Sequence, residues 1–335
     1  MTDLGLDRRA EVTPAPPMRF MTRVAAGILA APVILRLATV LLLCACLTVA
    51  TPNFLTEMNI LNVLRQTALL FLVASGLTLV LIGGGIDLSV GANLGLSACV
   101  SALVLQATGS LALTLAAGIA IGTLVGFANG LLVAVMRIPP FIATYGMLWV
   151  LLGITYRVMA GESVHGFPAS FRFLGSGHLF GVPVPVYLMF LFLGVGGLFL
   201  SRTRWGQEVY AMGANPEAAR LSGIPIRSRQ ILTYTLSGAM AGLAALVLLA
   251  RVNSAEGDIG EAMTLPAITA VLIGGTSLFG GLGTVSGTFV GALILTLVIN
   301  GMNLLSVHSN WQPFVAGAIV ILAVLVDRLT SQRQS

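Results

Sequence analysis

An aspartate that follows three consecutive glycines is the sharpest candidate for a functional side chain in this sequence. The segment reads Gly83-Gly-Gly-Ile-Asp87-Leu-Ser89. Three glycines should interrupt a helix, after which Asp87 or Ser89 can cap the next one. A carboxylate within a membrane is costly and suggests function, but a cap needs only neighbouring backbone amides, which favours the structural interpretation of Asp87. Irregular backbone at membrane depth is tolerated where protein covers it or it lines a cavity, so we expect the glycine loop beside a pathway.

The second candidate is an arginine-rich internal loop, residues 202–230. Within it, Asn215 has the properties of a helix N-cap, Pro216 suits the first helical position, and Gly223 should end the helix. A helix this short is not stable by itself, so we expect it to dock onto a partner. The alternative is a helix on the membrane surface with Arg220 on lipid headgroups, which its few large apolar residues disfavour. The residues expected to carry the partner contact are Asn215, Glu217, Ala218, Arg220 and Gly223.

Weaker candidates lie in or beside apolar stretches. An asparagine amide there bonds a neighbouring helix or, in a pathway, contacts solute hydroxyls. Arg157 faces either an aqueous vestibule or the membrane interface, which its long side chain can reach. A second glycine-rich break begins at Gly274. The residues that we expect along a pathway are Gly85, Asp87, Ser89, Asn93, Arg157, Gly274, Gly275, Gly281, Asn300 and Asn303.

No pattern in the sequence predicts catalysis or a metal site. The apolar stretches hold no histidine pair, carboxylate dyad or nucleophile and base at suitable spacing, and Cys44, Cys46 and Cys99 show no metal-ligand spacing. The chain also lacks lysine, because all 17 basic residues are arginine. A P-loop needs a lysine on the terminal phosphates, so if ATP drives this protein, another chain must bind it.

The composition is that of an integral membrane protein. Of 335 residues, 57% are hydrophobic and 9% are charged, and the mean hydropathy is +0.98, whereas about a quarter of the residues in a soluble domain are charged. The net charge of +5 could suggest nucleic acid. Arginines between apolar stretches reflect membrane topology more simply, so we expect a lipid bilayer and no nucleic acid as the surroundings.

We predict an all-α polytopic bundle of ten membrane spans. Residues 1–32 form a polar, proline-containing cytoplasmic tail, residues 33–327 the membrane domain with the loop 202–230, and residues 328–335 a second tail. Each span has roughly the 20 apolar residues that cross a bilayer. The predicted spans are 33–50, 65–83, 88–107, 111–136, 140–160, 183–201, 231–250, 265–281, 284–300 and 311–327.

The arginines predict the orientation, since positively charged loops stay in the cytoplasm. With an even number of spans, both termini lie on one side. If the N-terminus is inside, the inner side collects 13 of the 17 arginines, and the outer side keeps all three histidines. The outer arginines are then Arg65, Arg157, Arg172 and Arg251. We therefore expect both termini in the cytoplasm.

Two regions share a local pattern that suggests an internal repeat. Val80-Leu-Ile-Gly-Gly84 recurs as Val271-Leu-Ile-Gly-Gly275, and each is followed by a glycine-rich break. Paired glycine-broken segments in two halves of a membrane protein indicate a transport site. Glycines four apart also let helices approach closely in lipid, which is a packing role. Such faces occur at Gly118, Gly122, Gly126 and Gly130, and again at Gly283, Gly287 and Gly291.

Four motifs resemble the ribose-type permeases of bacterial ABC sugar importers, in order and at that family's spacing. They begin with Gly85-Ile-Asp-Leu-Ser-Val-Gly91 and Gly213-Ala-Asn-Pro-Glu-Ala-Ala-Arg-Leu-Ser-Gly-Ile224, and continue with Gly274-Gly-Thr-Ser-Leu-Phe-Gly-Gly281 and Asn300-Gly-Met-Asn-Leu-Leu305. The resemblance implies an inner-membrane permease without a cofactor of its own. It would pair with a second copy or a related permease, receive sugar from a periplasmic binding protein, and be driven by a cytoplasmic ATPase subunit that binds ATP and Mg²⁺. In that family the short internal helix docks on the ATPase, which here corresponds to residues 213–226.

The sequence departs from that family at two positions. Thr264-Leu-Pro-Ala-Ile268 stands where the family usually has Glu-Leu-x-Ala-Ile, and Leu152-Gly153 where it has Arg-Gly. Both changes lie toward the outer half, so they leave the sugar open among pentoses, hexoses, polyols and furanose-like signal molecules.

Other classes of protein remain as alternatives. A secondary transporter also uses broken helices, but it usually places carboxylates or histidines inside the bundle, and here Asp87 at the edge is the one candidate. A passive membrane scaffold has no use for glycine-weakened helices. Among ABC proteins, a branched-chain amino-acid permease shares features of the glycine-rich second half, and the run from Gly85 to Gly91 favours the sugar type.

Overall fold

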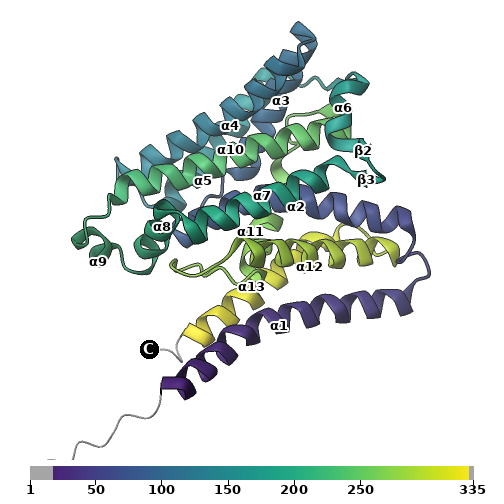
Figure 1. Cartoon of the computed structure of the whole chain (residues 1–335). Coiled ribbons are helices and arrows are strands. Elements are labelled where there is room, and N and C mark those ends of the chain that lie inside the picture. The colour runs from purple at the N-terminus through teal and green to yellow at the C-terminus, as the bar shows by residue number, and fades with distance from the viewer. Residues whose placement is uncertain (1–17, 332–335) are drawn as a thin grey trace, which may run out of the picture.

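The computed structural model describes residues 18–331, which fold into a bundle of α-helices (Figure 1). Its first half contains α1 (Met18–Ala50), α2 (Glu57–Ile82), α3 (Val90–Thr108), α4 (Leu111–Ala134), α5 (Pro140–Met159) and α6 (Ala169–Ser176). Its second half contains α7 (Val184–Arg202), α8 (Arg204–Ala214), α9 (Pro216–Leu221), α10 (Ile226–Val252), α11 (Thr264–Ile273), α12 (Val285–Leu304) and α13 (Trp311–Ser331). A 3-10 turn, Glu261–Met263, precedes α11.

Two very short antiparallel pairs of strands accompany the helices. β1 (Val164–His165) pairs with β4 (Ser254–Ala255), and β2 (His178–Leu179) pairs with β3 (Val182–Pro183). Together with α6 they form the connections at the end of the bundle opposite α8 and α9 (Figure 1). The sequence patterns did not predict these elements, because each is too short to show a hydrophobic period.

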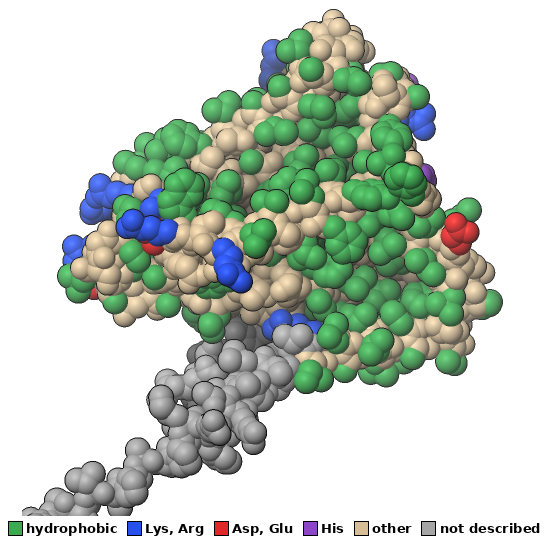
Figure 2. Space-filling view, in the orientation of Figure 1, with side chains coloured by type: hydrophobic (Ala, Val, Ile, Leu, Met, Phe, Trp, Pro, Cys, Tyr) green, Lys and Arg blue, Asp and Glu red, His purple; other side chains and the backbone are tan. Residues whose placement is uncertain are grey.

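Helix α2 is the centre of the bundle. In its most apolar window 89% of the residues are buried, against 22% to 28% in α4, α5 and α7. Phe71, Leu72 and Leu77 of α2 are fully buried. Helices α4, α5 and α7 bury one side against this core and leave apolar side chains outside, as expected of helices in hydrocarbon. Figure 2 shows such a hydrophobic face, with basic side chains gathered at the end that holds α8 and α9.

The glycine face of α4 packs directly against α10, as the four-residue spacing predicted. A methyl group on Gly122 would lie 2.7 Å from Gly242 Cα, and one on Gly126 would lie 2.9 Å from Gly238 Cα. The second glycine face, on α12, packs in the same way against the end of α11, where a methyl group on Gly291 would lie 2.7 Å from the Gly274 nitrogen. These backbone-to-backbone contacts are those that small residues permit in a membrane.

Seven of the described helices are long and apolar enough to cross a membrane. They correspond to seven of the ten predicted spans. The other three predicted spans fall on shorter apolar segments, Ile34–Ala50, Glu261–Ile273 and Trp311–Leu322. The all-α prediction is confirmed, and the number of helices that actually cross the membrane stays a prediction.

Three predicted boundaries differ from the structure. The predicted span 265–281 is helical only to Ile273, because Gly274 and Gly275 cap it. Helix α2 starts at Glu57 rather than at residue 65, since Thr56 caps it by accepting from the Asn59 N–H. Helix α1 spans Met18–Ala50 and so begins within the predicted tail 1–32, and Pro32 lies inside it. Residues 1–17 and 332–335 of the two predicted tails lie outside the described residues.

Candidate functional site

The predicted short helix in the arginine-rich loop is α9. Asn215 Oδ1 accepts from the Ala218 N–H at 3.0 Å, Pro216 is the first helical residue, and Gly223 follows the helix with φ +81°. The prediction of the cap, the start and the end of this helix is therefore confirmed. Leu221 is 76% exposed at its end, so the helix presents both polar and apolar surface outward.

Glu217 and Arg220 form an exposed ion pair on α9. Arg220 Nη2 donates to Glu217 Oε1 at 2.6 Å, and Arg220 Nε donates to Oε2 at 3.2 Å. Both side chains remain about two-thirds exposed. The hydrogen bonds from Arg220 lower the pKa of Glu217 below its ordinary value. The helix thus carries a fixed charge pattern that a partner protein can recognise.

Glu208 of α8 fastens the loop to the bundle. Its buried carboxylate accepts from Arg204 Nε at 2.7 Å and from Arg229 Nε, and the Arg229 guanidinium lies 5.6 Å from the centre of the Trp205 ring. Sequence reasoning missed Glu208, although Arg204 and Glu208 have the i, i+4 spacing of a helical ion pair. The hydrogen bond from Arg229 is the main cause that lowers the pKa of this carboxyl group.

The first glycine break turns the chain between α2 and α3. Asp87 is almost fully buried, and its Oδ1 accepts from the Ser89 N–H at 2.9 Å and from the Ser89 hydroxyl at 2.7 Å. The Ser89 hydroxyl in turn accepts from Asn129 Nδ2 of α4 at 2.8 Å, and makes no cap bond to the first turn of α3. Tyr234 of α10 donates to the Ile86 carbonyl at 3.0 Å. These bonds fix the Asp87 carboxylate inside the loop, and whether it also lines a pathway stays a prediction.

The second glycine break repeats the local geometry of the first. After α2, Gly84 N–H donates to Leu81 O and Gly85 N–H to Val80 O; after α11, Gly275 N–H donates to Leu272 O and Thr276 N–H to Val271 O. This is the Schellman pattern of helix termination. Gly84 and Gly275 have φ +77° and +78°, a conformation that glycine adopts without strain. The two Val-Leu-Ile-Gly-Gly segments thus share one structure, while an internal repeat of the whole bundle stays a prediction.

The two breaks meet each other at the carboxyl end of α8. The Gly281 N–H donates to the Ile82 carbonyl at 2.8 Å. A methyl group on Gly280 would lie 2.9 Å from Gly84 Cα, and one on Gly213 of α8 would overlap the Ile82 carbonyl oxygen. We call this meeting of Gly84, Gly213, Gly280 and Gly281 the glycine junction. It brings predicted pathway and coupling segments together, which the sequence had not indicated.

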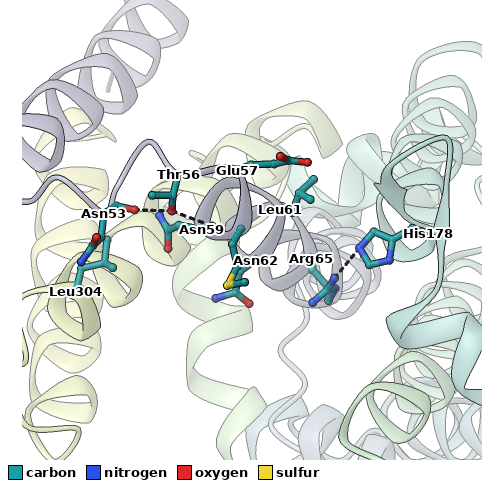
Figure 3. A pocket seen from close by; sticks show the side chains of 10 residues that line it. Asn53, Thr56, Glu57, Asn59, Leu61, Asn62, Arg65, His178 and Leu304 are labelled. Atoms are coloured by element: carbon teal, nitrogen blue, oxygen red, sulfur yellow. Dashed lines mark hydrogen bonds between the residues drawn. The ribbon is translucent and has the colours of Figure 1, made fainter.

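A pocket of about 880 Å³, lined by both polar and apolar side chains, lies at the opposite end of α2 (Figure 3). Arg65 Nη2 donates to His178 Nε2 of β2 at 3.1 Å, and Arg251 Nη2 lies 3.5 Å from Asn62 Oδ1. Asn59 of α2, which lines this pocket, and Asn300 of α12 exchange amide hydrogen bonds of 2.7 and 3.2 Å. Sequence reasoning placed Arg65 and His178 outside, but did not assign them to a site.

The remaining predicted residues lie apart from these groups. Asn93 donates to the Gly122 carbonyl at 3.2 Å and so joins α3 to α4. Asn303 accepts from Gln312 Nε2 at 2.8 Å on the surface. Arg157 is exposed in the last turn of α5. The structure therefore divides the predicted pathway residues between the two glycine breaks, the opposite end of α2, contacts between helices, and the exposed surface.

Both departures from the family pattern lie against the start of α3. The Thr264 hydroxyl accepts from the Gly91 N–H at 3.2 Å. Leu152 is buried in an apolar cluster with Ala92 and Leu96. The hydroxyl of Thr264 and the aliphatic side chain of Leu152 therefore stand where that family usually has a glutamate and an arginine.

Comparison with known proteins gives this architecture a class. Residues 59–324 match the family model described as branched-chain amino acid transport system / permease component. The ribose import permease protein of Bacillus subtilis (strain 168) is 41% identical over 286 residues, covering 85% of this chain and 89% of that protein. The D-allose transport system permease protein of Escherichia coli (strain K12) is 36% identical over 280 residues, covering 83% and 86%. The galactose/methyl galactoside import permease protein of the same strain is 31% identical over 313 residues, covering 88% and 93%.

The chain belongs to this family of ABC transporter permeases. It is a multi-pass membrane permease component, and the ATPase of such a transporter is a separate subunit. The predicted resemblance is thereby confirmed, as is the prediction that this chain hydrolyses no ATP. No solved structure matches the chain.

Proposed function

We propose that this chain is the membrane-spanning permease subunit of an ATP-driven importer for a monosaccharide or a related polyol. The observation that carries this proposal is the extended similarity to permeases named for ribose, allose and galactose, at 31% to 41% identity over most of the chain. The family model takes its name from branched-chain amino-acid transport, so an amino-acid importer is the competing reading. The similarity to several sugar permeases along most of the chain favours sugar.

The substrate class is tested by uptake into proteoliposomes. The chain is reconstituted with its cognate ATPase and binding protein, and radiolabelled pentoses, hexoses, polyols and leucine are compared at equal concentration. ATP-dependent uptake of a sugar or polyol, without uptake of leucine, is expected. Uptake of leucine alone would show that the protein is an amino-acid permease.

The partner that fits α9 is the cytoplasmic ATPase subunit. The support is physical: a six-residue helix is too short to be stable alone, yet this one has a satisfied cap, a fixed Glu217–Arg220 pair and an exposed Leu221. A preformed helix of this kind loses little entropy when a groove of another protein receives it. Asn215, Glu217, Ala218, Arg220 and Gly223 are the residues of this contact.

The docking role predicts the result of a double substitution. Glu217→Ala combined with Arg220→Ala removes the charge pattern but leaves the cap of α9 intact. We expect the permease to insert and fold normally, while ATPase stimulation and sugar uptake both fall by about tenfold or more. Glu162→Ala, which removes an exposed acidic side chain just after α5, is the control and should change neither. Normal uptake and stimulation in the double variant would refute docking through α9.

Two copies of the chain, or this chain and a related permease, enclose a pathway that passes beside the glycine junction, and a periplasmic binding protein delivers the sugar. Both termini are cytoplasmic, in keeping with the arginine distribution. The three shorter apolar segments enter the membrane with the seven long helices, since their composition suits hydrocarbon.

A further inference from the structure

The carboxyl end of α8 is wedged between the two glycine breaks. Gly213 touches the end of α2 at the Ile82 carbonyl, and a methyl group on it would also lie 2.6 Å from the Gly281 nitrogen. A methyl group on Gly281 would lie 2.7 Å from Ala214 Cα. The three segments are separated by more than 60 residues of sequence at each step, yet their backbones are in contact with no side chain between them.

Hydrogen bonds fix this arrangement. The Gly281 N–H donates to the Ile82 carbonyl at 2.8 Å, which joins the two breaks to each other. The Tyr210 hydroxyl of α8 donates to the Gly283 carbonyl at 2.6 Å, which joins α8 to the second break. The amides of Gly83, Gly84, Gly274 and Gly275 are bonded within their own helix ends. These backbone groups are therefore hydrogen-bonded within the chain, and they hold the three segments of the glycine junction against one another.

Helix α8 is suited to transmit force. It is tied to the start of α10 through the buried Glu208 and Arg229, and one residue, Asn215, separates it from α9. The interactions of Glu208 and the cap of α9 limit bending between the surface helix and the glycine junction. Packed elements of this kind switch between discrete arrangements instead of deforming continuously.

We propose that α8 is a strut that moves both glycine breaks together when α9 is displaced, with Gly213 and Tyr210 as its positioning residues. Gly213 permits the close approach to α2, and Tyr210 holds the second break on the same helix. A displacement at the cytoplasmic surface then reaches the ends of α2 and α11 at once. The inference rests on the proposed function, since it assumes that an ATPase displaces α9.

Two substitutions test the strut separately from docking. Tyr210→Phe removes the hydrogen bond to Gly283 and keeps the ring, and Gly213→Ala forces the backbones of the junction apart. Gly194→Ala and Gly197→Ala in α7 are matched controls, because a methyl group at either position meets nothing within 4 Å. The measured quantity is the number of sugar molecules taken up per ATP hydrolysed, in proteoliposomes that contain equal amounts of assembled complex.

The strut predicts that both junction variants still bind the ATPase and hydrolyse ATP, while uptake per ATP falls by about fivefold or more. A merely structural defect would reduce the amount of complex and lower uptake and hydrolysis together, leaving their ratio unchanged. An unchanged ratio in Tyr210→Phe would overturn the proposal, and this variant alone decides the matter if Gly213→Ala does not assemble. Loss of ATPase binding is expected only for Glu217→Ala combined with Arg220→Ala. A failure of docking can therefore be distinguished from a failure of the strut.

A second readout follows the movement of the break directly. Phe279 is 68% exposed in the second break and can be replaced by cysteine in a background that lacks the three native cysteines. Its rate of reaction with a thiol reagent should differ between ATP-bound and nucleotide-free complexes, and Tyr210→Phe should reduce that difference about fivefold or more. A nucleotide-dependent rate that persists unchanged in Tyr210→Phe would contradict the strut.

Discussion

Asn59 and Asn300 satisfy each other's amides between α2 and α12, and this pair is the clearest polar contact between helices distant in sequence. Asn300→Ala leaves the Asn59 amide with an unpaired group in a buried position. We expect the free energy of unfolding in detergent to fall by about 1–2 kcal/mol. Asn303→Ala, whose amide bonds Gln312 on the surface, is the control and should cost about 0.5 kcal/mol or less. Equal stability of the two variants would show that the buried pair contributes nothing.

Gly85 is the position at which a side chain would disturb the first break most directly. A methyl group there would lie 2.6 Å from the Tyr234 hydroxyl, which is bonded to the Ile86 carbonyl. Gly85→Val should therefore break that bond and displace the loop, and we expect uptake to fall by about tenfold or more with little change in the amount of complex. Gly153→Ala, in open space on α5, serves as the comparison. If the Gly85→Val variant takes up sugar at the wild-type rate, the first glycine break has no part in the transport cycle.

At the residue scale, the sequence predicted local caps and turns better than it predicted contacts between distant segments. The N-cap Asn215 and the break at Gly83 followed from local rules, because a cap or a glycine turn needs only neighbouring residues. The contacts of Asp87 with Asn129 through Ser89, and of Gly213 with Ile82, join distant segments. No local pattern encodes such contacts, which is why the glycine junction was not predicted.

At the element scale, Glu208 makes the attachment of α8 depend on pH. Its hydrogen bonds from Arg229 and Arg204 lower its pKa below the ordinary value of 4.5. A group whose pKa is lowered by folding adds stability that is fully present above its unfolded pKa and is lost as the pH falls through the folded pKa. The free energy of unfolding of the wild-type protein should thus exceed that of the Glu208→Gln variant by a constant amount above about pH 5. This difference should shrink in more acid solution.

Thermal unfolding of the two proteins between about pH 3 and pH 7 measures this difference. Glu217→Gln is the appropriate comparison, because the pKa of Glu217 is lowered too but its ion pair is about two-thirds exposed. Water screens such a pair, so its effect should be small. A stability difference for Glu208→Gln that did not change with pH would exclude the buried carboxylate as its source.

The elements that sequence reasoning missed share a physical cause. Helix α8 is amphipathic and polar on one side, and within the loop 202–230 the sequence pattern predicted only the short helix that begins at Pro216. The early end of α11 was missed because the predicted span was extended toward bilayer-crossing length through the break at Gly274, where residues 275–281 carry no charge. In contrast, the seven long helices were predictable, since a run of about 20 apolar residues leaves the backbone no alternative to a helix in lipid.

At the scale of the whole molecule, the predicted orientation can be tested with single cysteines in a background that lacks the native ones. Cysteines at Ser176 and Ser309 should react with a membrane-impermeant thiol reagent added from outside, whereas one at Ser228 should not. The described ends of the chain lie at the same end of the bundle as α8 and α9 (Figure 1), so this experiment also places both termini. The opposite labelling pattern would reverse the orientation.

The close packing of α4 (Leu111–Ala134) on α10 (Ile226–Val252) also bears on how the protein is made. These helices are separated by roughly 90 residues, so α4 leaves the ribosome and enters the membrane well before its partner exists. An isolated helix has all its backbone hydrogen bonds satisfied in lipid. Helix α4 can therefore stay in the membrane, with its glycine face against acyl chains, until α10 is inserted. The contact between α4 and α10 then forms late in synthesis. A bulky residue at Gly122 or Gly126 should therefore leave early insertion intact and arrest assembly only once α10 arrives, producing a membrane-inserted but protease-sensitive chain.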